Sequence, residues 1–169
     1  MIPMSDLLDQ VKDAFGNGYA IDREIGRGGM ATVYLALDPK HNRKVAVKVL
    51  LSELAKSLTA ARFLREIEMA AGLAHPNIVP VYDSGEADGF LYYVMPFIDG
   101  ENLQHCLREQ GRLAVEQTIQ IAREVASALS YAHKQNIIHR DIKPGNILFV
   151  EVHAMVTDFG IGKAMCDVC

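Results

Sequence analysis

A glycine-rich stretch between two strand-like runs is the feature that most restricts the fold of this chain. Residues 26–33 read Gly-Arg-Gly-Gly-Met-Ala-Thr-Val, and the runs at 19–24 and 32–37 flank them. In a dinucleotide-binding or P-loop fold, such a loop leads from a strand into a helix, and the P-loop ends in Gly-Lys-Ser/Thr. Here the loop joins two strands. This arrangement argues against both folds and predicts a β-hairpin whose backbone can approach a phosphate chain closely.

Hydrophobic periodicity predicts that this hairpin belongs to an antiparallel sheet with one inserted helix. Strands are expected at residues 19–24, 32–37, 44–50, 78–83 and 90–97, and a helix at 53–73 lies between the third and the fourth. A separate amphipathic helix is expected to start after Ser5, to end at Gly16-Asn17-Gly18 and to pack on the main domain.

After Asp99-Gly100 the periodicity becomes helical. A short helix is expected at 102–110 and a long one at 115–134, before a segment at 137–156 that alternates apolar and polar residues. One apolar face is expected on the long helix, formed by Ile119, Ala122, Val125, Ala126, Leu129 and Ala132.

The composition is that of an ordinary globular protein. The 169 residues are 50% hydrophobic and 22% charged, with a formal net charge of −4. This balance is unlike that of a disordered chain, and it provides no basic patch for nucleic acid or anionic lipid. Three cysteines are too few for a disulfide scaffold, and no apolar run is long enough to span a membrane. The absence of a signal peptide predicts a cytoplasmic location.

Lys48 and Glu66 form a candidate charge pair. Residues 45–48 read Val-Ala-Val-Lys, so Val45 and Val47 share one face of a strand and Ala46 and Lys48 share the other. Glu66 lies within the apolar stripe of the helix expected next along the chain. Alone, Lys48 could be a solvated lysine of an edge strand, and Glu66 is more simply interpreted as a solvated helix residue. Together, each supplies the opposite charge that the other would need if it were buried.

Two further motifs carry a family resemblance. Residues 139–146 read His-Arg-Asp-Ile-Lys-Pro-Gly-Asn, and Asp158-Phe159-Gly160 begins twelve residues after Asn146. With the glycine-rich loop and Lys48, these motifs make the chain closely resemble the eukaryotic-like serine/threonine protein kinases widespread in bacteria, from residue 19 to about residue 165.

The resemblance implies an α+β, protein-kinase-like two-lobe fold. Residues 1–18 would form an N-terminal amphipathic helical extension. Residues 19–98 would form an N-lobe with a five-stranded antiparallel sheet and one helix, and residues 99–169 an incomplete, mainly helical C-lobe.

The implied chemistry is transfer of the γ-phosphoryl group of Mg-ATP to Ser or Thr hydroxyls of a protein substrate. In this interpretation Asp141 accepts the proton of the substrate hydroxyl, and Lys143 lies beside the transferring group. A lysine two residues after the aspartate is typical of the serine/threonine class. Asn146 and Asp158 would hold two Mg²⁺ ions.

The resemblance also implies an ATP site. Lys48 would hold the α- and β-phosphates, and Glu66 would orient Lys48. The loop over the phosphates would comprise Gly26, Arg27, Gly28, Gly29, Met30 and Ala31. The adenine pocket would comprise Ile25, Val33, Ala46 and Leu148, with Met95 as gatekeeper and with the Pro96 carbonyl and the Ile98 N–H at the purine edge.

The chain departs from the family pattern in two places. Ala31 stands where a third loop glycine is usual, which predicts a slightly stiffer loop. The sequence given ends nine residues after Gly160, before the activation segment and later helices of such kinases. Arg140 would then have no activation-loop phosphate to meet. The catalytic loop should be poorly preorganised. Helix 115–134 should present an uncovered apolar face that fits a partner.

Cys166 and Cys169 form a Cys-Asp-Val-Cys ending. Zinc would need two further ligands, and prenylation would need an aliphatic residue where Asp167 stands, so free thiols are the simplest interpretation.

The sequence leaves three functions open. The first is a protein serine/threonine kinase. The second is a nucleotide-binding or partner-binding fragment with little or no phosphotransfer. The third, a small-molecule phosphotransferase of related fold, is disfavoured by the Lys143-Pro144 pair and by the Asp-Phe-Gly motif.

Overall fold

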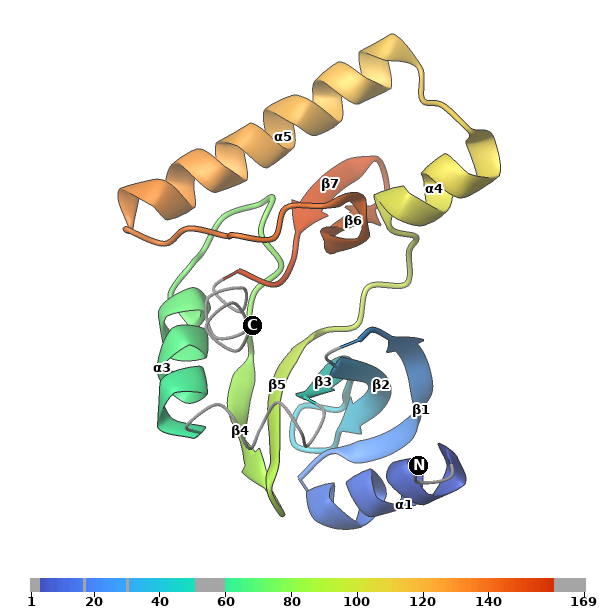
Figure 1. Cartoon of the computed structure of the whole chain (residues 1–169), viewed down its shortest axis with the longest axis vertical. Coiled ribbons are helices and arrows are strands. Elements are labelled where there is room, and N and C mark those ends of the chain that lie inside the picture. Colours follow the sequence, from blue (N-terminus) through green and yellow to red (C-terminus); the bar gives the residue numbers. More distant parts are fainter. Residues whose placement is uncertain (1–3, 17, 30, 51–59, 160–169) are drawn as a thin grey trace. The chain divides into compact units, whose positions relative to one another are not determined.

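The computed structural model describes residues 4–16, 18–29, 31–50 and 60–159. Figure 1 shows their elements in chain order. The expectations for Met30, Asn17, the helix at 53–59, Gly160, Cys166 and Cys169 lie outside these residues.

Five antiparallel strands form the sheet, in the order β1-β2-β3-β5-β4. The strands span Ala20–Arg27 (β1), Ala31–Asp38 (β2), Arg43–Leu50 (β3), Asp83–Ala87 (β4) and Phe90–Pro96 (β5). The predicted five-stranded antiparallel sheet is therefore confirmed. Its β4–β5 turn is Asp88-Gly89, with φ of 46° and 80°, as a two-residue type I′ hairpin requires.

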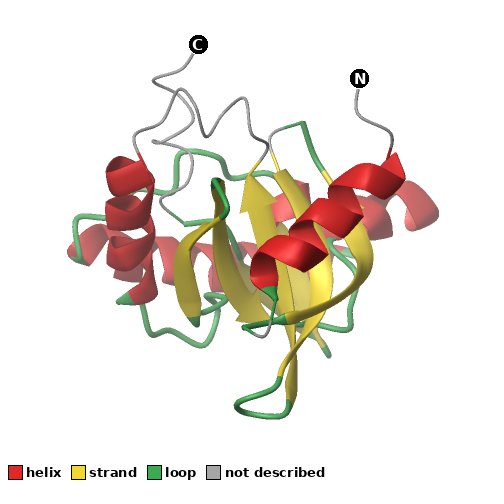
Figure 2. Ribbon diagram, turned by 90° about the horizontal axis from the view of Figure 1, so that it is seen from below, coloured by secondary structure: helices red, strands yellow, loops and turns green. Residues whose placement is uncertain are grey.

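The helix α1 (Met4–Phe15) covers one face of this sheet, as Figure 2 shows. Val11 and Phe15 are buried in a cluster whose sheet members include Tyr34, Val45 and Val47. The ring of Phe15 meets that of Tyr92 edge-on, with centroids 4.6 Å apart. The expected packing of an amphipathic helix on the main domain is confirmed.

The strand expected at 78–83 is wrong. Ile78 and Val79 are buried, and both are bonded to Val156: Ile78 through an isolated parallel bridge and Val79 by its N–H at 2.9 Å. The strand of the sheet begins only at Asp83, the last residue of the expected range, and it includes Gly85. Ile78 thus packs in a core cluster separate from that of the sheet, together with Val156.

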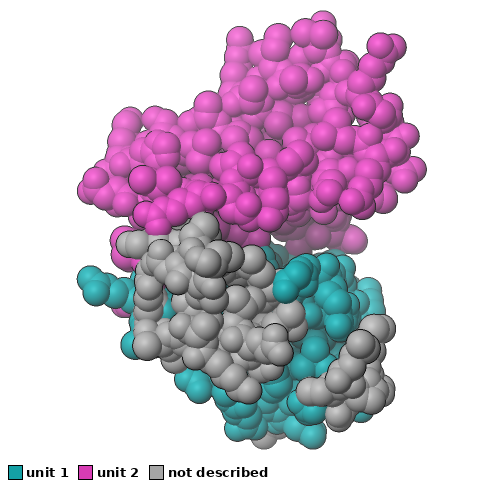
Figure 3. Space-filling view, viewed as in Figure 1, with its two compact units in different colours: residues 1–65, 81–97, 168 teal, residues 66–80, 98–167, 169 magenta. Residues whose placement is uncertain are grey.

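The contacts divide the chain into two compact units, coloured in Figure 3. Unit 1 contains the described residues within 1–65 and 81–97, and unit 2 those within 66–80 and 98–167. The lobe boundaries expected at 19–98 and 99–169 stay a prediction. The helix α3 (Ala60–Ala71) includes residues of both units, and its Phe63 and Ile67 are fully buried.

Unit 2 combines helices α4 (Leu103–Gln110) and α5 (Val115–Lys134) with a 3₁₀ turn at Pro144–Asn146 and a hairpin of β6 (Ile147–Val150) and β7 (His153–Val156). α4 begins at Asn102, whose side chain accepts a hydrogen bond from the His105 N–H at 2.9 Å. Figure 1 shows the hairpin beside α5. Among the described residues, no helix combines the length and the apolar character needed to cross a bilayer.

The apolar face expected on α5 is only partly right. The buried positions are Ile121, Ala128 and Ala132, and Val125 and Leu129 pack beside them. Ile119, by contrast, is 47% exposed, and Ala122 and Ala126 are also exposed. α5 carries two apolar stripes, and its periodicity alone does not decide which one faces the core. The exposed stripe begins at Val115.

Candidate active site

One face of the unit 1 sheet carries most of the side chains expected around the nucleotide. Lys48 pairs directly with Val33 on β2 and with Tyr93 on β5, so the three side chains share a face. Ala46 and Met95, two residues along their strands, lie on the same face. Val45 and Val47 point to the opposite face, under α1. The predicted alternation along β3 is confirmed.

Lys48 is half-buried on this face. Its Nζ lies 5.8 Å from the centre of the Tyr93 ring, within reach of a cation–π contact. Glu66 lies on α3 and is also half-buried, but it belongs to unit 2. The Lys48–Glu66 pair therefore stays a prediction.

The glycine-rich loop is the connection between β1 and β2, as expected. Gly26 pairs with Val33, and the N–H of Gly28 donates to the Ala31 carbonyl at 2.8 Å. Arg27 turns back onto its own strand and donates from Nε to Glu24 at 2.9 Å. The side chain of Ile25 is 40% exposed. An added Cβ at Gly29 would meet nothing within 4 Å, so the backbone there is open to a ligand.

A separate group of candidate residues surrounds Asp141 in unit 2. Lys143 donates from Nζ to the Asp141 carboxylate at 2.6 Å. Asn146 donates from Nδ2 to the Asp141 carbonyl at 2.8 Å and to its carboxylate at 3.2 Å. Asn146 is buried, whereas the carboxylate of Asp141 and the ammonium of Lys143 remain about half exposed. Lys143 and Asn146 thus fix the direction of the carboxylate, and its exposed part remains accessible to a substrate.

His139 ties this loop to the segment before Asp158. Its ring is buried, with Nε2 at 2.8 Å from the Thr157 carbonyl and Nδ1 at 3.2 Å from the Asp141 N–H. Since a carbonyl needs a donor and an N–H needs an acceptor, the ring is neutral, with its proton on Nε2. Burial lowers its pKa below the ordinary value of 6.5 and maintains that state. The Phe159 ring packs edge-on against it, with centroids 4.7 Å apart.

Two backbone positions at this site have left-handed conformations. Arg140 has a φ of 68° and Asp158 a φ of 67°, values that are uncommon for residues other than glycine. Arg140 lies between His139 and Asp141, which share a hydrogen bond, and Asp158 follows Thr157, whose carbonyl accepts from His139. Such strained positions often occur where a side chain must be held at a functional site.

Asn146 and Asp158 are chemically suited to Mg²⁺. Because the amide nitrogen of Asn146 donates to Asp141, its Oδ1 is the atom left to face a cation. Thr157 connects the two residues: its N–H donates to the Asn146 carbonyl at 3.0 Å, and its hydroxyl donates to Asp158 at 3.4 Å. An amide oxygen and a carboxylate are hard ligands of the kind that bind Mg²⁺ together with phosphate oxygens. The donor set therefore fits the expected metal.

Of the other residues predicted for the adenine pocket, Pro96 belongs to unit 1, whereas Ile98 and Leu148 belong to unit 2. Pro96 ends β5 and pairs with Val45, and Ile98 is the first residue of unit 2 after it. Leu148 lies on β6, where it pairs with Met155 and bridges to Asn102. The structure thus groups Asp141, Lys143, Asn146 and Asp158 in unit 2, and groups Val33, Ala46, Lys48 and Met95 on one sheet face in unit 1. The roles assigned to them stay predictions.

Sequence reasoning assigned no role to His139 or Thr157. His139 lay within the quoted motif, but its partner is 18 residues away and contributes only a backbone carbonyl, which carries no side-chain signal.

The alternation of apolar and polar residues at 137–156 was a sequence signal for the β6–β7 hairpin. Glu151 at its turn has a φ of 56°, a conformation that a turn residue must accept.

Comparison with known proteins supports the family resemblance that the sequence motifs indicate. Residues 19–167 match the family described as protein kinase domain. The chain is 46% identical over 156 residues to the serine/threonine-protein kinase PknJ of Mycobacterium tuberculosis, covering 89% of this chain and 26% of that protein. It is 44% identical over 149 residues to the serine/threonine-protein kinase PrkC of Bacillus subtilis, covering 87% and 23%. The chain thus spans about a quarter of the length of these relatives.

Solved structures agree with the fold. The crystal structure of the M. tuberculosis PknI kinase domain is 37% identical and superposes with a TM-score of 0.79, over 85% of this chain and 59% of that one. The match to the family over nearly the whole chain, together with this likeness in fold, identifies the chain as a member of the protein kinase domain family.

Proposed function

We propose that this chain supplies the ATP site and the phosphotransfer loop of a protein serine/threonine kinase acting in the cytoplasm. The reaction would move the γ-phosphoryl group of Mg-ATP to a Ser or Thr hydroxyl of a protein. The convergence of Lys143 and Asn146 on the carboxylate of Asp141 is the observation that supports this proposal most strongly.

Asp141 would accept the proton of the attacking hydroxyl. Its carboxylate is about half exposed, and two side chains fix its direction, so it is ready to receive a hydrogen bond from a substrate. A loose phosphoryl transition state needs positioning and charge neutralisation more than covalent help. Lys143, at 2.6 Å from Asp141, would supply a positive charge for the transferring group.

Mg²⁺ would neutralise the phosphate charge when bound. Asn146 would offer Oδ1, and Asp158 would offer its carboxylate. Lys48 would hold the α- and β-phosphates, with Glu66 orienting its ammonium. Val33, Ala46 and Met95 form an apolar sheet face suited to a purine ring.

A second candidate is a nucleotide-binding module without transfer. The observation that favours it is the apolar sheet face of Val33, Ala46 and Met95, which suits a purine ring without any part played by Asp141. A binding module of this kind would need the sheet face of unit 1 but no substrate hydroxyl near Asp141. The exposed stripe of α5, at Val115 and Ile119, would then suit a protein partner that covers it.

The test uses labelled ATP, Mg²⁺ and a generic basic protein. Transfer by the unmodified chain, lost in Asp141→Asn and retained in Glu109→Gln, supports the kinase. Glu109 is an exposed residue of α4 and serves as a matched control. A rise in Tm with Mg-ATP but without transfer supports the binding module instead. A properly folded chain with neither response would overturn both functions.

A further inference from the structure

A cavity of about 600 Å³ lies in unit 1, at the end of α1 and on the sheet face that this helix covers in Figure 2. Its walls come from the last turn of α1, the turn between β2 and β3, and the β4–β5 hairpin with the residue before it. None of the residues proposed for ATP binding or phosphotransfer lines it. We propose that it binds an aryl phosphate, which is a phosphate monoester carried on an aromatic ring. The phosphate would meet Lys40 and Arg43, and the ring would pack against Tyr19 and Tyr92.

A buried carboxylate fixes the cationic wall of the cavity. Asp38 is 4% exposed, and one of its oxygens accepts from Nδ1 of His41 at 2.7 Å and from Nε of Arg43 at 3.1 Å. Its other oxygen accepts from the backbone N–H groups of Lys40 and His41, at 3.1 and 3.2 Å. Because four donors converge on it, Asp38 orients the turn and leaves the remaining nitrogens of His41 and Arg43 available to a ligand.

The hydrogen-bonding capacity left in the cavity consists mainly of donors. Among the described residues, the exposed ammonium of Lys40 makes no ion pair. The guanidinium of Arg43 lies over the Tyr82 ring, 3.8 Å from its centre, so its plane is held while both Nη groups remain available. The second carboxylate, of Asp83, already accepts from the Tyr19 hydroxyl and from a backbone N–H, each at 2.8 Å. A fixed guanidinium fork beside an ammonium is an arrangement that binds phosphate.

Aromatic rings form the other wall. Tyr19 and Tyr92 are half-buried, and their rings meet at 70° with centroids 6.5 Å apart, so they form a corner. The Phe15 ring supports Tyr92 from the helix side, at 4.6 Å. Burial and the neighbouring Asp83 raise the pKa of Tyr19, which keeps its hydroxyl protonated and bonded to that carboxylate. A corner of two fixed rings accepts a third ring in stacked or edge-on contact.

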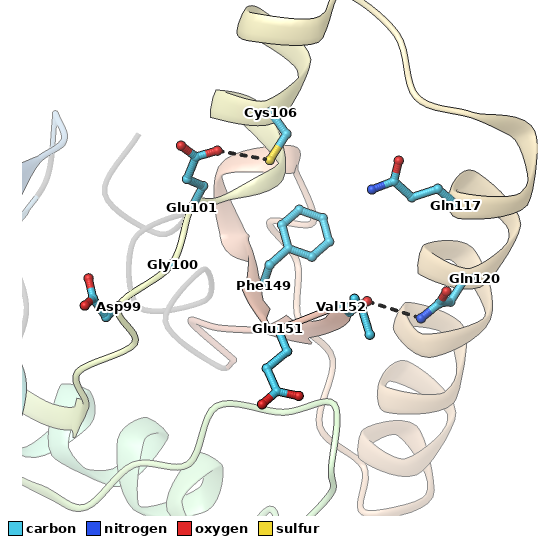
Figure 4. A pocket seen from close by; sticks show the side chains of 9 residues that line it. All are labelled: Asp99, Gly100, Glu101, Cys106, Gln117, Gln120, Phe149, Glu151 and Val152. Carbon is cyan, nitrogen blue, oxygen red and sulfur yellow. Dashed lines mark hydrogen bonds between the residues drawn. The ribbon is translucent and has the colours of Figure 1, made fainter.

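The size and the charge of the cavity favour an organic anion over simpler ligands. Its volume falls within the range of about 300–1,000 Å³ that is typical of sites for organic ligands. Inorganic phosphate would leave the aromatic wall without a contact. Figure 4 shows a contrasting cavity in unit 2, whose lining contains three carboxylates, of Asp99, Glu101 and Glu151, and no lysine or arginine. That cavity repels an anion, whereas the cavity in unit 1 provides both a cationic and an aromatic wall.

The test measures binding by isothermal titration calorimetry and needs neither ATP nor phosphotransfer, so it is independent of the proposed function. The probe is N-acetyl-phosphotyrosine amide, titrated into the full chain. Lys40→Gln should raise Kd about fivefold, and adding Arg43→Lys, which keeps a charge beside Asp38 but removes the planar fork, about tenfold or more. The matched control is Lys44→Gln, because Lys44 is an exposed lysine on the opposite face of β3. It lies outside the lining and should leave Kd within about twofold.

Changes in the ligand test its two parts separately. N-acetyl-tyrosine amide lacks the phosphate and N-acetyl-phosphoserine amide lacks the ring, and each should bind about tenfold more weakly than the probe. Tighter binding of phosphotyrosine flanked by two alanines on each side would identify a protein segment as the source of the ligand, and equal binding would identify a free aryl phosphate.

Two results would overturn the proposal. The first is an equal Kd for the Lys40 and Lys44 variants, with Tm confirming that both are folded. The second is binding of inorganic phosphate as tight as that of the probe, which would mean that the cavity takes an adventitious ion only.

Discussion

His139 donates a hydrogen bond from Nε2 to the backbone carbonyl of Thr157, 18 residues away, at 2.8 Å. Through its other nitrogen the same ring accepts from the N–H of Asp141. One buried imidazole therefore sets the position of the loop that carries Asp141 relative to the segment that carries Asp158. A charged ring could not accept from Asp141, so this junction depends on neutrality.

This arrangement predicts a pH-dependent stability. The folded-state pKa of His139 lies below the unfolded value of 6.5 because burial disfavours the charged ring. The unfolded chain therefore binds the proton first, and the stabilisation present above pH 6.5 is lost as the pH falls through the folded-state pKa. His139 therefore contributes to the slope of the free energy of unfolding against pH, by at most about 1.4 kcal/mol per pH unit. In His139→Gln this contribution should disappear.

Urea unfolding between pH 5 and 8 measures this slope. His133→Gln is the matched control, because His133 is an exposed residue near the end of α5. The comparison concerns the slope and not the absolute free energy of unfolding, so a general destabilisation of His139→Gln does not affect it. The same slope in the His139 variant as in the control would show that another group titrates.

Asn146 should be a stabilising residue as well as a candidate metal ligand. Its buried amide donates to both the carbonyl and the carboxylate of Asp141, and Asn146→Ala leaves both acceptors without this donor. We expect a loss of about 1–3 kcal/mol in the free energy of unfolding. Denaturant titration measures it, with Gln110→Ala, at an exposed residue at the end of α4, as control. A loss under about 0.5 kcal/mol would mean that water replaces the amide.

The two stripes of α5 should differ sharply in their sensitivity to truncation. Ile121 is 6% exposed and packs with Leu103 and Ile147, whereas Ile119 is 47% exposed. Ile121→Ala should lower the free energy of unfolding by about 2–4 kcal/mol, and Ile119→Ala by less than about 1 kcal/mol. Thermal or urea unfolding of both variants measures the difference. A larger effect at Ile119 would mean that the exposed stripe is covered in solution.

Gly100 should tolerate no side chain. The added Cβ of Gly100→Ala would overlap the backbone carbonyl oxygen of Phe149, and a shift that relieves the overlap would strain the hydrogen bond from the Phe149 N–H to the Glu101 carbonyl. Destabilisation of more than about 1 kcal/mol is expected. Gly72→Ala is the control, because its Cβ would meet the nearest atom at an ordinary 3.5 Å. Equal unfolding midpoints for the two variants would contradict the close packing of segment 99–101 on β6.

Local patterns were sufficient for much of the candidate site. Asp141, Lys143 and Asn146 lie within six residues of one another, so a single loop brings them together once its motif is recognised. Alternation along β3 likewise placed Lys48 with Ala46, because side chains on a strand change face at every residue. The turn at Asp88-Gly89 could have been predicted from the same kind of local signal.

The sequence by itself determined the antiparallel sheet, the hairpin position of the glycine-rich loop and the residues that one loop or strand brings together, since each depends on neighbours along the chain. Only the tertiary structure decided that Ile78 and Val79 pack away from the sheet, that α5 buries Ile121 and exposes Ile119, and that His139 meets Thr157. These outcomes depend on which distant segments compete for the same apolar surface or the same backbone carbonyl, and that competition leaves no local pattern in the sequence.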